Sequence, residues 1–191
     1  MLLRVIDIVA GTSVDGPHLR TSIYLAGCAH HCPGCHNPQS WDPHAGHEIA
    51  VSDLLDVIAR EEMPVTLSGG DPLFQAEGIA ALTRLLKDRH KTSSPPCRAW
   101  PWPGPTGRRW GEDPRGVGEA DIWLYTGYRW EQIVATPRLL DAVSNVDVVV
   151  DGPFVQSLRD TTLLFRGSSN QRIIDVAASL ASGTAIPLSL D

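Results

Sequence analysis

Residues 27–37 read Gly-Cys-Ala-His-His-Cys-Pro-Gly-Cys-His-Asn, and the interpretation of the whole chain begins with them. Three of the four cysteines of the chain lie here, at Cys28, Cys32 and Cys35, with the spacing Cys-x3-Cys-x2-Cys. The Pro-Gly pair inside the stretch favours an irregular loop. The glycines let the backbone come close to whatever the sulfurs hold. We therefore expect a loop whose three thiolates converge on one inorganic centre.

Two kinds of centre suit three thiolates. Iron–sulfur clusters are held by Cys thiolates, usually four, so three ligands would leave one iron without a protein sulfur. An open position on a metal centre is where substrates bind and react. The alternative is structural zinc, with His30, His31 or His36 as the fourth ligand. A disulfide framework is disfavoured, because the number of cysteines in the stretch is odd.

Composition predicts one globular domain over residues 1–191, with 42% apolar and 20% charged residues. The net charge of −6 gives no reason to expect nucleic-acid binding. No apolar run is long enough for a signal peptide or a transmembrane helix, so we expect no membrane partner. We expect a cytoplasmic protein, in which thiols remain free to bind metal.

Apolar β-type runs alternate with helical patterns along the chain. Strands are expected at 2–9, 21–26, 65–67, 121–125, 146–150 and 172–176, and helices at 53–62, 75–90 and 130–143 with a restart at Pro137. Ser52 is the expected N-cap of the first helix. Such alternation predicts an α/β fold with a mainly parallel sheet and helices on its outer face.

Several polar residues and glycines directly follow expected strands. The cysteine loop follows the second strand, and Ser68-Gly69-Gly70-Asp71-Pro72 follows the third. Thr126 and Asp151 follow the two strands after that. Ligands of parallel α/β folds bind at the carboxyl ends of strands. Thr126 and Asp151 are therefore candidate cofactor contacts, although their position suits structural roles equally well.

Residues 92–119 interrupt the pattern with prolines, glycines and three tryptophans. A disordered surface loop and a docking surface for a protein partner are the two interpretations. Cys97 lies in this insertion and is interpreted as an incidental free thiol. Residues 177–191 are weakly patterned and predict a loose tail. His44 and His47 are expected to be solvated loop histidines.

The cysteine motif, placed after an apolar strand, resembles the cluster loop of radical S-adenosylmethionine (SAM) enzymes. The longer string of residues 27–41, which ends in Asn-Pro-Gln-Ser-Trp, is more specifically similar to the activating proteins of anaerobic ribonucleoside-triphosphate reductases. Three later strings agree with that family in order: Ser68-Gly69-Gly70-Asp71-Pro72-Leu73, Trp123-Leu124-Tyr125-Thr126-Gly127-Tyr128 and Phe165-Arg166-Gly167-Ser168-Ser169-Asn170-Gln171.

The resemblance implies a partial (β/α) barrel and an activating enzyme. In such an enzyme Cys28, Cys32 and Cys35 hold three irons of a 4Fe–4S cluster, and the amino and carboxylate groups of SAM bind the fourth. Reductive cleavage of SAM yields a 5′-deoxyadenosyl radical, which generates a glycyl radical on the partner reductase. A reduced flavodoxin or ferredoxin is the implied electron donor.

The resemblance also assigns cofactor contacts. Gly70, and with it Gly69 and Asp71, would bind the methionine moiety of SAM. Many radical SAM proteins have an aromatic residue just before the last cysteine, where this chain has Gly34. His36, directly after Cys35, is therefore our candidate for the contact with adenine.

Other functions remain open from the sequence. The chain would also suit an activase of another glycyl-radical enzyme, such as a formate-lyase type, or a small radical SAM synthase. From a different class, a zinc-stabilised binding module without catalysis fits the cysteines. Arg166 either faces an anionic group or the partner's loop, or is an exposed turn arginine.

Overall fold

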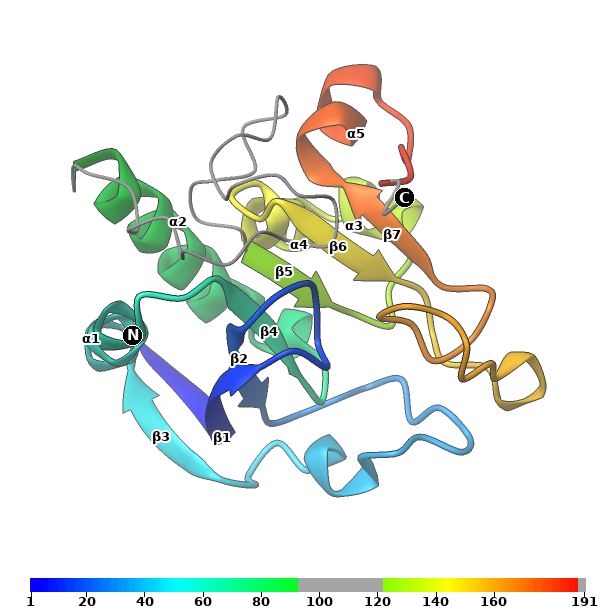
Figure 1. The fold of residues 1–191 in the computed structure, drawn as a ribbon, viewed down its shortest axis with the longest axis horizontal. Helices are drawn as coiled ribbons and strands as arrows, with labels where there is room; N and C mark the ends of the chain where they lie inside the picture. Colours follow the sequence, from blue (N-terminus) through cyan, green and yellow to red (C-terminus); the bar gives the residue numbers. More distant parts are fainter. Residues whose placement is uncertain (93–121, 189–191) are drawn as a thin grey trace.

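The computed structural model describes residues 1–92 and 122–188 (Figure 1). The strands of these residues form one sheet with the order β3-β1-β2-β4-β5-β6-β7. Their bounds are β1 Leu2–Thr12, β2 Arg20–Leu25, β3 His47–Ala50, β4 Val65–Gly69, β5 Ile122–Tyr125, β6 Val148–Asp151 and β7 Arg172–Asp175. The insertion from residue 93 onward, with Cys97, lies outside the described residues.

The four central strands, β2, β4, β5 and β6, are parallel neighbours. β1 pairs with both β2 and β3 in antiparallel fashion, and β7 pairs with β6 in the same way. The expected α/β class and mainly parallel sheet are confirmed. The sheet is open, with β3 and β7 at its two edges, so it does not form a closed barrel. The partial barrel remains a prediction.

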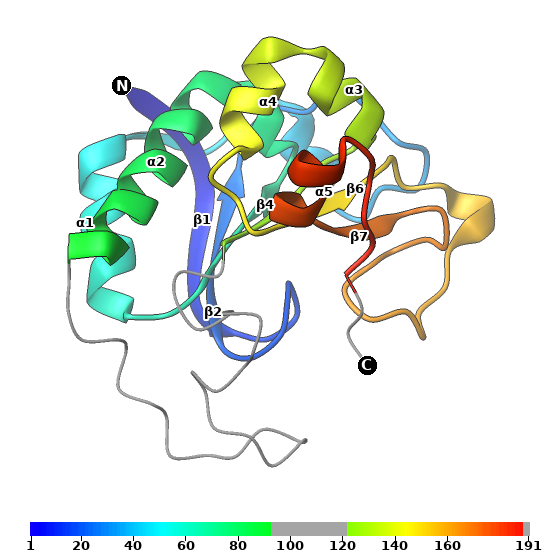
Figure 2. The same ribbon diagram turned by 90° about the horizontal axis from the view of Figure 1, so that it is seen from above.

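Helices α1 to α4 cover one face of the sheet, as Figure 2 shows. Buried side chains of these helices, such as Leu54, Leu82 and Ile133, form the main core with Leu67 and Leu124 from the strands. The helices are α1 Val51–Glu61, α2 Ala76–Thr92, α3 Trp130–Ala135, α4 Pro137–Val143 and α5 Val176–Ser182. No helix of the described residues is long and apolar enough to cross a membrane.

The opposite face carries a smaller apolar cluster and a buried arginine. Trp123, Val150 and Ile173 belong to this cluster. Arg20 is fully buried; its Nε donates to Thr66 Oγ1 at 2.7 Å, and its guanidinium carbon lies 5.4 Å from the centroid of the Trp123 ring. The two faces of the sheet therefore differ in character, because only one of them is covered by α1 to α4.

Three features differ from the sequence-based expectations. β3 has no counterpart among the expected strands, and His47, an expected loop histidine, is its first residue; pairing with β1 supplies its hydrogen bonds, and Glu48 pairs with Arg4. Ser52 is not the N-cap of α1, which already begins at Val51. The expected loose tail contains α5, whose first turn is capped by the Asp175 carboxylate accepting from the Ala178 amide at 2.9 Å.

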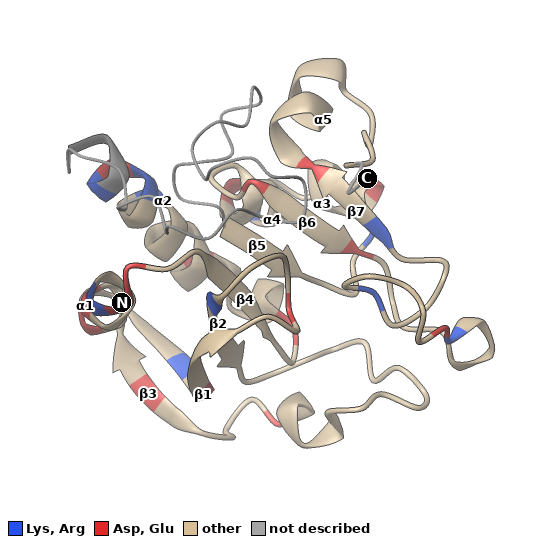
Figure 3. Ribbon diagram, viewed as in Figure 1, with Lys and Arg blue, Asp and Glu red and all other residues tan. Residues whose placement is uncertain are grey.

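Charged residues of both signs occur along the described elements (Figure 3). Several of them form ion pairs between elements that are distant in sequence. Lys87 of α2 lies 2.6 Å from Asp147, which precedes β6, and Arg84 of α2 pairs with Asp141 of α4 at 3.1 Å. These pairs join α2 to α4 and to the residue before β6.

Candidate cofactor site at the cysteine loop

The cysteine loop leaves the carboxyl end of β2 and returns through a short 3-10 helix at Pro38–Trp41. The two arms are joined by hydrogen bonds from the amides of Gly27 and Cys28 to the carbonyls of Ser40, at 2.9 Å, and Trp41, at 3.3 Å. Cys28, Cys32 and Cys35 are free thiols; Cys28 is buried and the other two are half-buried. The two ends of the loop are thus held together by hydrogen bonds, and the three thiols lie on the loop between them.

Backbone amides point at all three sulfurs. The amides of His30 and His31 donate to the Cys28 sulfur, and that of Phe154, after β6, donates to the Cys32 sulfur. The Asn37 amide lies 3.4 Å from the Cys35 Sγ. Burial raises the pKa of Cys28 and of Cys32, and these hydrogen bonds work against that rise. Hydrogen bonds to sulfur favour the thiolate form and tune a bound cluster, so the residues fit an iron–sulfur cluster.

The histidines of the loop contact other groups. His30 Nε2 lies 2.8 Å from Asp71 Oδ2, the His31 ring packs on Trp41 with centroids 4.9 Å apart, and His36 is exposed. Within residues 1–92 and 122–188, no three His, Cys, Asp or Glu side chains are arranged around one metal-ion position. His44 and His47 are exposed, as expected.

The Gly-Gly turn after β4 packs directly against the cysteine loop. The Gly70 amide donates to the Leu25 carbonyl, and the Asp71 amide donates to the Gly27 carbonyl, both at 2.8 Å. A Cβ on Gly70 would lie 2.4 Å from the Gly27 carbonyl oxygen. Glycine is therefore required here for the close approach of two loops to each other.

Asp71 connects three loops at the carboxyl edge of the sheet. Its side chain is 2% exposed. Its Oδ1 accepts from the Leu73 amide at 2.9 Å, and its Oδ2 accepts from the Thr126 hydroxyl at 2.9 Å and from the Gly127 amide at 3.0 Å. With His30 at the same oxygen, this carboxylate joins the cysteine loop, the Gly-Gly turn and the segment after β5.

Asp151 is engaged in a second buried cluster. Its carboxylate accepts from the Trp130 amide at 2.7 Å and from the guanidinium of Arg172. Arg172 also pairs with both oxygens of Glu131 at 3.1 Å. Hydrogen bonds to Asp151, and then to Glu131, raise the pKa of Arg172, and the hydrogen bond from Arg172 lowers the pKa of Glu131. Asp151 thereby fixes the start of α3.

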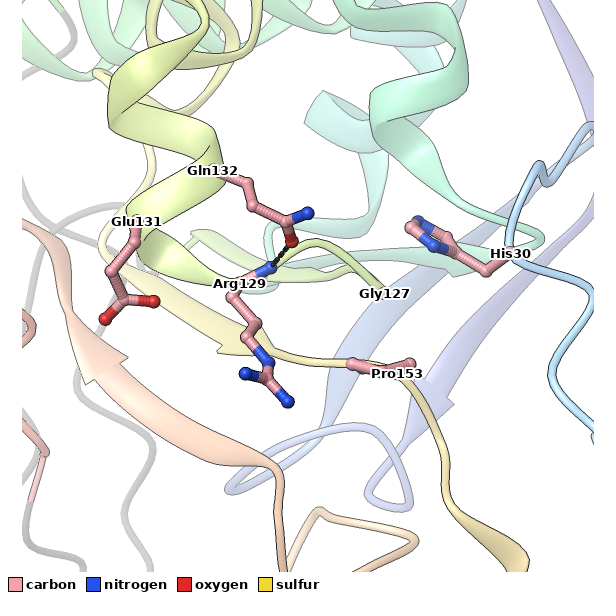
Figure 4. Close-up of a pocket in the computed structure, with 6 residues that line it drawn as sticks. All are labelled: His30, Gly127, Arg129, Glu131, Gln132 and Pro153. Atoms are coloured by element: carbon pink, nitrogen blue, oxygen red, sulfur yellow. Dashed lines mark hydrogen bonds between the residues drawn. The ribbon is translucent and has the colours of Figure 1, made fainter.

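A pocket of about 590 Å³ opens beside the cysteine loop, between the segments that follow β5 and β6 (Figure 4). This volume lies within the range of small-molecule sites. Its wall combines polar side chains with a glycine and a proline: His30, Gly127, Arg129, Glu131, Gln132 and Pro153. The Arg129 amide donates to Gln132 Oε1 at 2.9 Å, which holds one side of the wall in place.

The structure brings most of the predicted site residues to one edge of the sheet. The cysteines, Gly69, Gly70, Asp71, Thr126 and Asp151 all lie at or just after the ends of the four central strands. Gly34 and His36 are not among the residues of the pocket wall. Sequence analysis missed Arg129, Glu131, Gln132 and Pro153 as pocket residues; for Arg129 and Pro153 the position soon after a strand end was a usable signal, whereas Glu131 and Gln132 lie in α3.

A comparison with protein families identifies the class of protein to which this fold and its cysteine loop belong. Residues 14–111 and 113–174 match the family model described as "4Fe-4S single cluster domain". The chain thus belongs to the family of 4Fe–4S single-cluster domains, with its cysteine loop at the carboxyl edge of an α/β sheet.

Curated relatives specify the family. Proteins named anaerobic ribonucleoside-triphosphate reductase-activating protein are similar over most of their length: 33% identical in Salmonella typhi and 32% in Escherichia coli K12, each covering 83% of this chain and 89% of the relative. The phage T4 protein is 31% identical over 84% of this chain and 86% of its own. The chain belongs to this family of activating proteins. This confirms the family and the enzyme class indicated by the motifs.

A solved structure is also similar over most of its length. The crystal structure of QueE from Escherichia coli covers 96% of this chain and 92% of its own, with a TM-score of 0.41 and 16% sequence identity.

Proposed function

We propose that this chain activates an anaerobic ribonucleoside-triphosphate reductase by generating a glycyl radical on it, with a 4Fe–4S cluster and SAM as cofactors. Membership of the activating-protein family and of the single-cluster family supports the proposal. The observation that carries it is the placement of a three-cysteine loop, with amides directed at its sulfurs, beside a pocket of about 590 Å³.

The residues of the loop would hold the cluster. Cys28, Cys32 and Cys35 each provide one thiolate, and the amide donors described above offset the burial that raises the pKa of Cys28 and Cys32. Three thiolates leave one iron of a 4Fe–4S cluster without a protein sulfur. The loop therefore suits a cluster with one position open for a cofactor.

The neighbouring turns would hold SAM. The main chain of Gly70 lies against the cysteine loop and that of Gly69 against the end of β2, and the resemblance places the methionine moiety at these glycines. Gly34 and His36 remain candidate contacts from the loop itself. Asp71, Thr126 and Asp151 have side chains already engaged in hydrogen bonds, so we propose that they act mainly by positioning these segments.

A 4Fe–4S cluster held by Cys28, Cys32 and Cys35 would supply the one-electron reduction that cleaves SAM to methionine and a 5′-deoxyadenosyl radical, and this radical would take a hydrogen atom from a glycine of the reductase. The contribution of the chain is to bind, orient and exclude water from the reacting groups. The pocket wall limits the freedom of the bound cofactor, and the open side of the pocket leaves room for the partner.

The partner, donor and location follow from the same proposal. The names of the relatives identify the reductase that those proteins activate. We propose the corresponding reductase of the same organism as the partner, a reduced flavodoxin or ferredoxin as the electron donor, and the cytoplasm as the location.

Electron paramagnetic resonance of the partner tests this function. The anaerobically prepared protein, SAM and a reductant are incubated with the candidate reductase, and a glycyl-radical doublet is expected on the reductase. Cys32→Ala is expected to abolish the signal, because the cluster loses a ligand. A reductase that stays radical-free with the wild-type protein, despite a full cluster and SAM cleavage, would contradict the proposed partner.

A further inference from the structure

His30 occupies the junction between the cysteine loop and the pocket. Its backbone amide donates to the Cys28 sulfur, whereas its imidazole leaves the loop and lines the pocket (Figure 4). Its side chain is only 19% exposed. One residue thus contacts both a proposed cluster ligand, through its main chain, and the pocket, through its ring.

Three neighbours fix the position of this ring. Asp71 Oδ2 lies 2.8 Å from Nε2, and the Tyr128 ring meets the imidazole edge to face with centroids 4.6 Å apart. Gly127 lies directly against the ring, since a Cβ there would be 2.4 Å from the imidazole Cδ2. The ring is therefore positioned by groups from two other loops.

The adjacent histidine has a different environment. His31 has a left-handed backbone with φ of 46°, and its exposed ring packs against Trp41. His31 is not part of the pocket wall. Since both histidines lie between Cys28 and Cys32, His31 is a matched internal control for His30.

The direction of the pocket indicates which part of a ligand it takes. The wall runs from His30 at the cysteine loop to Gln132 in the first turn of α3 (Figure 4). Under the proposed function, the amino-acid end of SAM lies at the cluster, so the part that extends into this pocket is the adenosine. A flat imidazole and the Pro153 ring suit a purine, and Gln132 offers an amide for its polar edge.

We propose that His30 is a positioning and contact residue for the adenosine moiety of the cofactor, packed against Asp71, Gly127 and Tyr128. This inference rests on the proposed function. His30 thereby joins His36, which is exposed and outside the pocket wall, as a candidate for the adenosine contact.

Equilibrium dialysis of the cluster-loaded protein, under anaerobic conditions, tests the proposal. We expect His30→Ala to weaken binding of SAM and of 5′-methylthioadenosine about tenfold, the loss of one aromatic contact. Binding of free methionine is expected to change less than twofold. Iron and sulfide per chain should stay at the wild-type level, because His30 is not a cluster ligand. His31→Ala is expected to bind all three probes as the wild type does.

A second variant displaces the His30 ring while leaving His30 itself unchanged. Gly127→Ala introduces a Cβ into the space of the imidazole, and we expect the same loss of 5′-methylthioadenosine binding. In the His30→Ala background the added Cβ finds open space, so the two losses should not add. Additive losses would overturn the assignment to His30.

The outcomes separate this inference from the proposed function. Wild-type binding of 5′-methylthioadenosine by His30→Ala, an equal loss for methionine, or a loss of iron would each overturn the role of His30 and leave the proposed function standing. A wild-type protein that carries a full cluster but binds no SAM would overturn the proposed function, and this inference with it.

Discussion

Asp71 shows how one buried carboxylate organises a site without reacting in it. Its Oδ2 accepts from a hydroxyl and from an amide, and it lies beside an imidazole. Hydrogen bonds to a buried charged group contribute about 1.5–3 kcal/mol each. Through these contacts, the side chain of this one residue connects the cysteine loop, the Gly-Gly turn and the segment after β5.

Replacing Asp71 by Asn tests this link. The amide has one acceptor oxygen in place of two, so we expect the free energy of unfolding to fall by about 2 kcal/mol. Urea denaturation of the cluster-free protein measures the change. Asp7→Asn, an exposed carboxylate on β1, is the matched control and should shift stability by less than about 0.5 kcal/mol. Equal effects of the two variants would contradict the proposed link.

The cysteines give a prediction about pH. Burial raises the pKa of the Cys28 and Cys32 thiols above the ordinary value of 9.0, so both hold their protons to higher pH in the folded, cluster-free protein. Alkylation by iodoacetamide requires the thiolate. We therefore expect both residues to react more slowly at pH 8 in the folded chain than in urea, as followed by mass spectrometry of the labelled peptides. Faster labelling in the folded chain would contradict the raised pKa values.

At the scale of elements, Asp151 and Arg172 join β6, β7 and the start of α3. Asp151 is 1% exposed, and removal of Arg172 would leave it buried without its ion-pair partner. Such a loss typically costs 3–5 kcal/mol when both charges are buried. The side chain of Arg172 is 37% exposed, so water would offset part of that cost.

We accordingly expect Arg172→Met to lower the free energy of unfolding by about 2 kcal/mol and to weaken SAM binding, because α3 forms one wall of the pocket. Arg84→Met breaks a pair whose side chains are 54% and 58% exposed, and its effect should stay below about 1 kcal/mol. Urea denaturation and equilibrium dialysis measure the two quantities. If the Arg172→Met protein were as stable as the Arg84→Met protein, the ion pair between Arg172 and Asp151 would not fix the start of α3.

Acid should weaken the ion-pair group formed by Asp151, Arg172 and Glu131, because Glu131 becomes protonated. Arg172 lowers the pKa of Glu131 below its ordinary value of 4.5. A carboxyl group with a lowered pKa in the folded state contributes stability above its unfolded pKa and loses it as the pH falls through the folded one. The difference in stability between wild type and Glu131→Gln should therefore be present at pH 7 and should shrink as the pH falls below 4.5 and through the lowered folded pKa. A difference that does not shrink as the pH falls below 4.5 would contradict this account.

Elements with a clear apolar period could be predicted from the sequence, and others could not. β5 and β6 are nearly continuous apolar runs, as buried parallel strands are, and the apolar spacing of α1 and α2 is helical. β3 has the sequence His-Glu-Ile-Ala, and its state is decided by pairing with β1. α5 consists mainly of small residues, and its cap at Asp175 is its main local signal.

At the scale of the whole molecule, topology explains which parts of the site were predictable. The positions of Asp71, Thr126 and Asp151 followed from strand ends in a parallel sheet. Their contacts did not, because hydrogen bonds such as that between Thr126 and Asp71 join residues 55 positions apart. The pocket wall likewise draws His30 and Pro153 from loops distant in sequence.

The insertion gives a prediction on the same scale. β4 pairs directly with β5, so the sheet is continuous between the described residues on the two sides of the insertion. We expect replacement of residues 94–116 by a short Gly-Ser linker to leave cluster content, SAM cleavage and the rate of reductase activation unchanged. Slower activation with unchanged SAM cleavage would instead show that the insertion docks the partner.

The most direct test of the central claim is the release of 5′-deoxyadenosine by the chain itself. Protein prepared without oxygen is analysed for iron and sulfide and is then incubated with SAM and a reductant. We predict a 4Fe–4S cluster per chain and reductive formation of 5′-deoxyadenosine and methionine, both abolished by Cys28→Ala, Cys32→Ala or Cys35→Ala. A chain that carries zinc without sulfide, or a full cluster that releases no 5′-deoxyadenosine on reduction, would contradict the account.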